Sequence, residues 1–303
     1  MISPTAIEDE LKSRFKELSK PMDASPTGTE PRLKRLPETR VLMYDFYGTL
    51  FLSGVGDIGI DDGKSDPGLM TEVLKSAGIK IKDPKAGERS FEIYTEVVQI
   101  EVEEFKKAGI RYPEPDIRKI WRDILITLHN EGLIVSIPDA FTNYRISVEF
   151  EARMNPVWPV DGAAETLLHY KKEGLLQGIL SNSQFYTPIV LEALMGRSIT
   201  ELGFHKELLH WSFEEKNKKP GLIFYRSFLE KLRKVDPSVK PEEILYAGND
   251  MLKDIYPASE LGMKTALFAG DKRSLKWRRD DDRCKNLQPD IVFTEFKQLK
   301  EVV

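Results

Sequence analysis

The chain has 303 residues, of which 41% are hydrophobic and 31% charged, with a net charge of −4 at pH 7. This composition is that of an ordinary globular protein and excludes a disordered chain. The slight negative charge does not favour a nucleic-acid partner. No apolar run reaches the roughly 18 residues of a membrane helix, so we expect no membrane partner.

The single cysteine, Cys284, excludes an internal disulfide and is typical of proteins from a reducing compartment. The residues that follow Met1 include several acidic side chains and lack the apolar core of a secretion signal. The sequence therefore predicts a cytoplasmic protein.

Residues 1–38 are predicted to form an N-terminal helix and a linker. Over residues 5–19, apolar side chains recur at helical spacing among charged ones, at Ile7, Leu11, Phe15 and Leu18. This apolar stripe is expected to dock on its own domain or on a second subunit, so a homodimer is one expected assembly. Residues 19–38 contain several prolines with Ser, Thr and Gly, which is typical of a linker.

Short apolar runs alternate with helical patterns through most of the remaining chain. The runs are Val41–Tyr44, Leu175–Leu180, Ile244–Ala247, Lys264–Phe268 and Ile291–Phe293. Helical patterns between them include Ala163–Lys172, Gly221–Arg233 and Ile255–Leu261. Alternation of this kind predicts an α/β fold, a doubly wound parallel sheet with helices on both faces. This Rossmann-like core would comprise residues 39–53 and 158–303.

Residues 54–157 interrupt the alternation. They contain amphipathic helical patterns, such as those of residues 91–105 and 117–128, and few signs of strands. We expect this segment to form an inserted helical cap domain with its own small core.

Polar side chains follow the predicted strands. Asp45 ends the first run and is followed by Tyr47, Gly48 and Thr49. A carboxylate at the carboxyl end of a buried strand, beside a turn rich in backbone N–H groups, is well placed to act as a nucleophile.

Three later segments carry further candidates: Ser181 and Asn182 end the second run, Lys219 precedes a helix, and Asp250 and Asp254 follow Ile244–Ala247. A serine hydroxyl can hold a substrate oxygen, and an ammonium group can offset the charge of two anions brought together. The sequence thus predicts one site made from separate segments.

The acidic residues also predict a metal site. Asp250 and Asp254, converging with Asp45 and the carbonyl of Phe46, would form a set of hard oxygen ligands suited to Mg²⁺. The alternative for Asp250 is that it caps a helix beginning near Met251. The stretch Asp271–Arg283, with its mixed charges, is predicted to be a solvated surface loop.

In these four segments the chain resembles the haloacid dehalogenase superfamily. The resemblance extends over about residues 40–55 and 157–295, and it implies that the inserted helices are the cap of such enzymes. It implies a nucleophilic Asp45 in a loop supported by Thr49, with Ser181, Asn182 and Lys219 binding the substrate. Asp250 and Asp254 would serve the metal. The family's last motif usually begins Gly-Asp, whereas Asn249 intervenes here; either Asn249 or Asp250 can take the first metal position, and we favour Asp250.

Tyr47 departs from the phosphatases of this superfamily, which carry a second aspartate there as a general acid. A tyrosine with a pKa near 10 is a poor acid at neutral pH. The 2-haloacid dehalogenases resemble this chain in having tyrosine at that position, but they use no metal. Because paired acids are costly without a cation, we favour a Mg²⁺-dependent phosphatase acting on a small anionic metabolite. A metal-free 2-haloacid dehalogenase and a non-catalytic binding protein are the alternatives.

Overall fold

The computed structural model describes residues 4–55 and 67–303, so part of the predicted cap segment, residues 56–66, lies outside the described residues. Two compact units are present. We call residues 20–55 and 157–303 the core unit, and residues 4–19 and 67–156 the cap unit. The N-terminal helix groups with the inserted helices, whereas residues 20–38 group with the sheet.

The core unit contains a six-stranded sheet with the order β5-β4-β1-β6-β7-β8, and each neighbouring pair is parallel. Its strands are β1 Val41–Tyr44, β4 Leu176–Ser181, β5 Phe204–Trp211, β6 Ile244–Gly248, β7 Lys264–Phe268 and β8 Ile291–Phe293. The chain proceeds outward from β1 in both directions, so the predicted doubly wound sheet is confirmed. The strand order reverses beside β1, which is where folds of this kind bind ligands.

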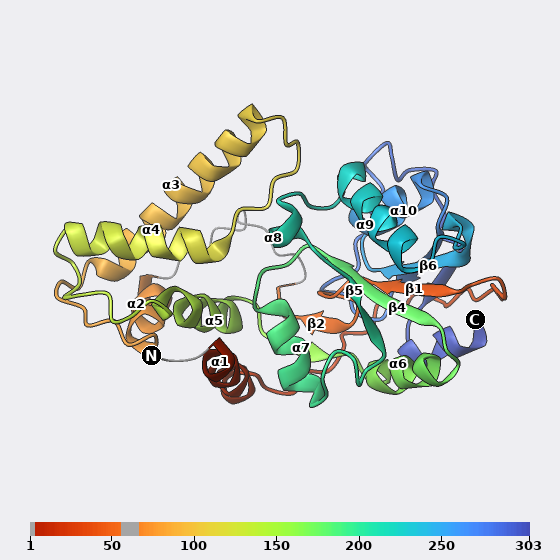
Figure 1. Cartoon of the computed structure of the whole chain (residues 1–303), viewed down its shortest axis with the longest axis horizontal. Helices are drawn as coiled ribbons and strands as arrows, with labels where there is room; N and C mark the ends of the chain where they lie inside the picture. The colour runs from red at the N-terminus through yellow and green to blue at the C-terminus, as the bar shows by residue number, and fades with distance from the viewer. Residues whose placement is uncertain (1–3, 56–66) are drawn as a thin grey trace. The chain divides into compact units, whose positions relative to one another are not determined.

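Helices cover both faces of this sheet, as Figure 1 shows for α9 and α10 on one face and α6 on the other. The helices of the core unit are α6 Ala163–Lys172, α7 Thr187–Met195, α8 Ser212–Glu215, α9 Leu222–Val235 and α10 Tyr256–Glu260, with short helical turns η2 Pro241–Glu243, η3 Met251–Ile255 and η4 Phe296–Glu301. The face under α9 is filled by apolar side chains such as Met43, Leu208 and Phe228. Their burial fixes the positions of the strand ends that carry the site.

Two features of the core unit were not predicted. Strand β5 carries charged side chains in its middle and lies at the edge of the sheet, so it lacks the continuous apolar run of the central strands. A second, two-stranded antiparallel sheet pairs β2 Phe51–Ser53 with β3 Val157–Pro159, at the two points where the chain leaves and re-enters the core.

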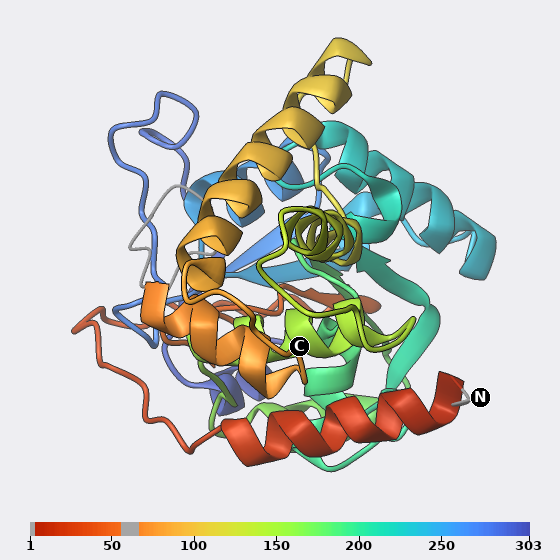
Figure 2. The same cartoon turned by 90° about the vertical axis from the view of Figure 1, so that its left-hand side faces the viewer.

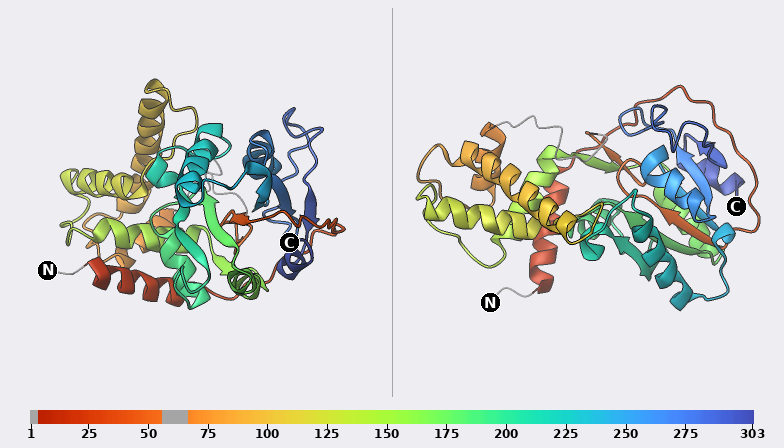
Figure 3. Two further views of the ribbon diagram at one scale, coloured as in Figure 1. Left: turned by 45° about the vertical axis from the view of Figure 1, so that its right-hand side comes forward. Right: turned by 90° about the horizontal axis from the view of Figure 1, so that it is seen from above.

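Residues 20–40 are packed against the core, so the prediction of a linker is wrong. Arg32 forms an antiparallel bridge with Val292 of β8, and the backbone N–H of Leu36 donates to the carbonyl of Val302. Thr27 donates to the carbonyl of Ala269. Figure 3 shows this segment passing along the C-terminal part of the chain. Its prolines and small residues suit an extended strap as well as they suit a linker.

The cap unit is helical, as predicted (Figure 2). Its helices are α1 Pro4–Leu18, α2 Pro67–Ser76, α3 Ala86–Lys107, α4 Ile117–Asn130 and α5 Thr142–Met154. Trp121 of α4 is fully buried and contacts the rings of Tyr94 and Phe150. Ile7, Leu11 and Phe15 of the apolar stripe of α1 are buried, and α1 packs on α5, so the stripe docks on its own chain, as one of the two expectations had it. No helix in the described part of the chain is long and apolar enough to cross a membrane.

Candidate active site

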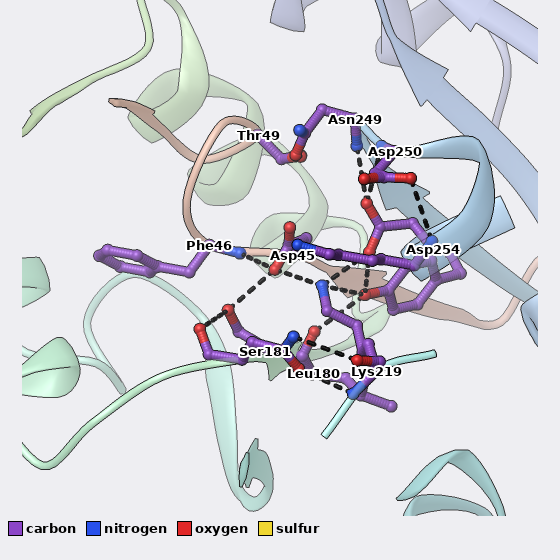
Figure 4. Close-up of polar contacts among 12 residues, drawn as sticks. Asp45, Phe46, Thr49, Leu180, Ser181, Lys219, Asn249, Asp250 and Asp254 are labelled. Carbon is purple, nitrogen blue, oxygen red and sulfur yellow. Dashed lines mark hydrogen bonds and ion pairs between the residues drawn. The ribbon is translucent and has the colours of Figure 1, made fainter. Parts of the chain in front are cut away.

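Asp45 lies directly after β1, where its backbone N–H still pairs with the carbonyl of Ala247 in β6. Its side chain is 7% exposed. One carboxylate oxygen, Oδ1, accepts from the backbone N–H of Phe46 at 2.8 Å and from the hydroxyl of Ser181 at 2.8 Å, and it lies 2.7 Å from the Nζ atom of Lys219. All three contacts are made by Oδ1, and no donor within residues 4–55 and 67–303 binds the other oxygen, Oδ2 (Figure 4). The carboxylate is therefore oriented by one oxygen while the other remains available.

Lys219 is the cation of this site, and it is 3% exposed. Its Nζ atom lies 2.7 Å from Asp45 Oδ1 and 2.6 Å from Asp254 Oδ1. Burial by itself lowers the pKa of Lys219, but the two carboxylates raise it by more, so the ammonium group stays charged. The structure thus joins the third and fourth predicted segments to Asp45.

Asp254 is fully buried and uses both carboxylate oxygens. Oδ1 pairs with Lys219, and Oδ2 accepts from the backbone N–H groups of Asn249 at 3.0 Å and Asp250 at 2.9 Å. Burial raises the pKa of Asp254 to about 7, against the opposing effect of Lys219. A side chain at Gly248 would collide with Asp254, because a Cβ atom there would lie 2.4 Å from the Asp254 Cβ. This glycine lets the acid fold back over the strand end.

Three further predicted residues, Ser181, Asn182 and Tyr47, have different contacts. Ser181 is buried and donates directly to Asp45, whereas Asn182 holds the backbone of Lys219. The Oδ1 atom of Asn182 accepts from the Lys219 N–H at 2.8 Å. The hydroxyl of Tyr47, which is partly exposed, lies 3.1 Å from the hydroxyl of Thr187. Asn182 is therefore placed to position Lys219. Tyr47 has no carboxylate that could act as a general acid.

Asn249, rather than Asp250, contacts the loop that follows Asp45. Its Oδ1 atom accepts from the hydroxyl of Thr49 at 3.1 Å, and its Nδ2 atom donates to the carbonyl of Ser274 at 2.7 Å. Gly48 leaves room for it, since a Cβ atom at Gly48 would lie 2.8 Å from the Asn249 amide. Thr49 therefore supports this loop through Asn249. The preference for Asp250 at the first metal position stays a prediction.

Asp250 caps the turn that follows β6, the alternative noted from the sequence. Its Oδ1 atom accepts from the N–H groups of Leu252 at 2.8 Å and Lys253 at 3.1 Å. Its Oδ2 atom pairs with the guanidinium of Arg278 at 2.6 Å. Sequence reasoning missed Arg278, which lies in the stretch predicted to be a solvated loop. The available signal was that this stretch follows β7, whose carboxyl end meets the same edge of the sheet.

The four residues predicted to hold Mg²⁺ do not fit the ion as they are arranged. The carbonyl of Phe46 accepts from two backbone N–H groups, those of Thr49 and Phe51. The carboxylates of Asp250 and Asp254 are paired with cations and backbone donors on both oxygens. Among the described residues, no three His, Cys, Asp or Glu side chains are grouped so as to hold a metal ion.

The remaining geometry suits covalent catalysis by a carboxylate. A hydroxyl, a backbone N–H and an ammonium group converge on one oxygen of Asp45, which fixes the direction in which the other oxygen can attack. The same ammonium group can offset the charge of an anionic substrate that approaches the carboxylate.

Comparison with known proteins agrees with this architecture. The 2-haloacid dehalogenase from Pseudomonas syringae pv. tomato DC3000 superposes with a TM-score of 0.52, covering 87% of this chain and 97% of that chain at 17% identity. The chain has the haloacid dehalogenase fold. The resemblance inferred from the four segments is thus confirmed at the level of the fold, sheet and helical insertion included.

In sequence, this chain is similar to the glyceraldehyde 3-phosphate phosphatase of Pyrococcus furiosus, with 33% identity over 145 residues. The match covers 48% of this chain and 54% of the relative, so this chain spans about half the length of the curated protein that it matches. No protein-family model matches the chain.

Proposed function

We propose that the chain is a hydrolase in which Asp45 attacks a small anionic metabolite. The observation that carries this proposal is the asymmetry of the Asp45 carboxylate, which is held through Oδ1 by Lys219 and Ser181 while Oδ2 points to no donor among the described residues. A carboxylate held in one orientation next to a buried ammonium group is the arrangement that nucleophilic catalysis requires.

A phosphate compound is the substrate class that we favour. Its support is the relative from Pyrococcus furiosus, which is a glyceraldehyde 3-phosphate phosphatase. In this reaction the Oδ2 atom of Asp45 would bond to phosphorus as the bond to the leaving oxygen breaks, and water would then cleave the aspartyl phosphate to release inorganic phosphate. Lys219 would offset the charge of the phosphoryl group, while Ser181 would keep the Asp45 carboxylate oriented through its hydrogen bond to Oδ1.

The Mg²⁺ ion stays a prediction from the sequence, and the arrangement of its expected ligands does not favour it. Tyr47 likewise supplies no ready acid for the leaving group, so we expect a substrate whose leaving group is good without protonation, such as an acyl phosphate. General acid catalysis is worth about 10²–10⁴-fold, so a poorer leaving group would react slowly rather than not at all.

A 2-haloacid dehalogenase is the second candidate. Two observations favour it: Tyr47 lies where a phosphatase would need its acid, and the carboxylates of Asp250 and Asp254 are occupied by Arg278 and Lys219. Halide leaves without a proton, and displacement at carbon by Asp45 needs no metal. A non-catalytic binding protein is the third alternative.

Two further expectations from the sequence, a cytoplasmic location and a homodimer, are also proposals.

The proposal is tested by assaying purified protein with phosphate compounds and with 2-haloacids, each with Mg²⁺ and with EDTA. Phosphate release supports the first candidate, and halide release supports the second. The isosteric variant Asp45→Asn should lower either activity by about 10³-fold or more, because it removes the nucleophile. Asp9→Asn, on the exposed face of α1, is the matched control and should retain full activity. If folded protein releases neither product, the hydrolase proposal fails.

A further inference from the structure

The Asp250 carboxylate is saturated by donors. Arg278 donates from Nη2 to Oδ2 at 2.6 Å, and its Nε atom lies 3.1 Å from Oδ2 and 3.2 Å from Oδ1. The backbone N–H groups of Leu252 and Lys253 bind Oδ1. A carboxylate offers about four lone-pair sites, and these five contacts fill them. Asp250 is 3% exposed, so a metal ion could reach it only by displacing the guanidinium.

The segment around Arg278 is built onto the end of β6. The backbone N–H of Met251 donates to the carbonyl of Lys276 at 2.9 Å, and the N–H of Lys276 donates to the carbonyl of Asn249 at 3.0 Å. These two bonds form a parallel bridge in which Asp250 lies opposite Lys276. Arg278 follows two residues later with a φ of 48°, a left-handed conformation that non-glycine residues seldom adopt.

The same segment is held from its other side by the strap of residues 20–40. The backbone N–H of Ser25 donates to Asp271 Oδ1 at 2.8 Å, and the N–H of Lys272 donates to the carbonyl of Ser25 at 2.7 Å. Asp271 is 1% exposed. The ion pair of Arg278 with Asp250 therefore belongs to a backbone-anchored structure rather than to two mobile surface side chains.

We propose that Arg278 is the resident cation of the Asp250 carboxylate and excludes divalent metal ions from it. The positive charge of the site then comes from two side chains: Lys219, which pairs with Asp45, and Arg278, which pairs with Asp250. Arg278 acts through Asp250 and so is a positioning residue. If the chain is the hydrolase proposed above, hydrolysis should proceed in the presence of EDTA; this consequence alone rests on the proposed function.

The probe is Mn²⁺, titrated calorimetrically and followed by electron paramagnetic resonance. We expect the unmodified protein to bind Mn²⁺ at least tenfold more weakly than Arg278→Ala, in which the Asp250 carboxylate is exposed to the ion. Adding Asp250→Asn to Arg278→Ala should abolish the new site. Arg279→Ala is the matched control: Arg279 is exposed and lies over the ring of Trp277, so its loss changes the net charge equally without freeing Asp250.

Stoichiometric Mn²⁺ binding by the unmodified protein that disappears in Asp250→Asn would overturn the inference. Failure of a folded Arg278→Ala variant to bind Mn²⁺ would also overturn it. Should Arg278→Ala not fold, the measurement on the unmodified protein and on Asp250→Asn still decides. Because binding is measured without substrate, the inference survives or fails independently of whether any phosphate or haloacid is hydrolysed.

Discussion

Asp45 and Asp250 follow neighbouring parallel strands, β1 and β6, whose pairing ends with Tyr44 opposite Ala247. Both side chains are buried, at 7% and 3% exposed. Asp45 is held through one oxygen, whereas Asp250 is held through both, by two backbone donors and a guanidinium. The same residue type at the same edge of the sheet thus keeps one oxygen available in one place and has both oxygens occupied in the other. The surrounding donors, not the strand end, make this difference.

The strongest way to break this contrast is to remove the ammonium group that Asp45 shares with Asp254. In Lys219→Met, two buried carboxylates lose their cation, and such a loss costs about 3–5 kcal/mol of unfolding free energy. Activity should fall as well, because the substrate's charge is no longer offset. Chemical denaturation measures the first effect.

The loss of stability in Lys219→Met should depend on pH. The folded-state pKa of Asp254, already raised to about 7, should rise further without Lys219, while the unfolded value stays near 3.8. The folded variant therefore binds more protons between these values, and its stability declines as pH rises from 4 through 7. The deficit relative to the unmodified protein should be larger at pH 8 than at pH 5, and Asp254→Asn in the Lys219→Met background should reduce it. An equal deficit at both pH values would contradict the assigned coupling.

A smaller loss of stability is expected from a substitution at Gly48, where the loop after β1 contacts Asn249 after β6. Gly48 has a φ of 82°, and a Cβ atom there would lie 2.8 Å from the Asn249 amide, which is fixed by hydrogen bonds at both ends. Gly48→Ala should cost about 1–2 kcal/mol for the backbone conformation and about 1–3 kcal/mol more for the collision. Gly78 is a matched control, with the same φ of 82° and nothing within 4 Å of an added Cβ atom. Equal losses in the two variants, measured by denaturation, would mean that the collision is relieved.

The contrast also separates what the sequence could predict from what it could not. Buried apolar runs predicted five of the six strands, all but β5. The rule that ligand groups gather at strand ends predicted that Asp45, Ser181, Lys219 and Asp254 meet. Their meeting within 2.8 Å is consistent with that reasoning. The rule says nothing of the partner of each oxygen. Arg278 reaches Asp250 across 28 residues through a backbone bridge, and no local pattern records such a contact.

The N-terminal segment was misjudged for a related reason. Composition rich in proline and small residues indicates an extended backbone without its own core, but it does not indicate what that backbone lies against. Ser25 and Thr27 bind Asp271 and Ala269 through single hydrogen bonds. Such contacts depend on where the sheet places the far end of the chain, which a local reading of residues 19–38 cannot reveal.

The smallest expected effect tests the hydrogen bond that joins the two strand ends. Thr49 is fully buried and donates to Asn249 Oδ1 at 3.1 Å. Thr49→Val keeps the shape and leaves that acceptor without its donor, at a cost of about 1–2 kcal/mol. Thr95→Val, on an exposed position of α3, should stay within about 0.5 kcal/mol of the unmodified protein. A double-mutant cycle of Thr49→Val with Asn249→Ala should give a coupling energy of about 1 kcal/mol. A coupling energy near zero would mean that the loop after Asp45 is held without Asn249, and that the ends of β1 and β6 are energetically independent.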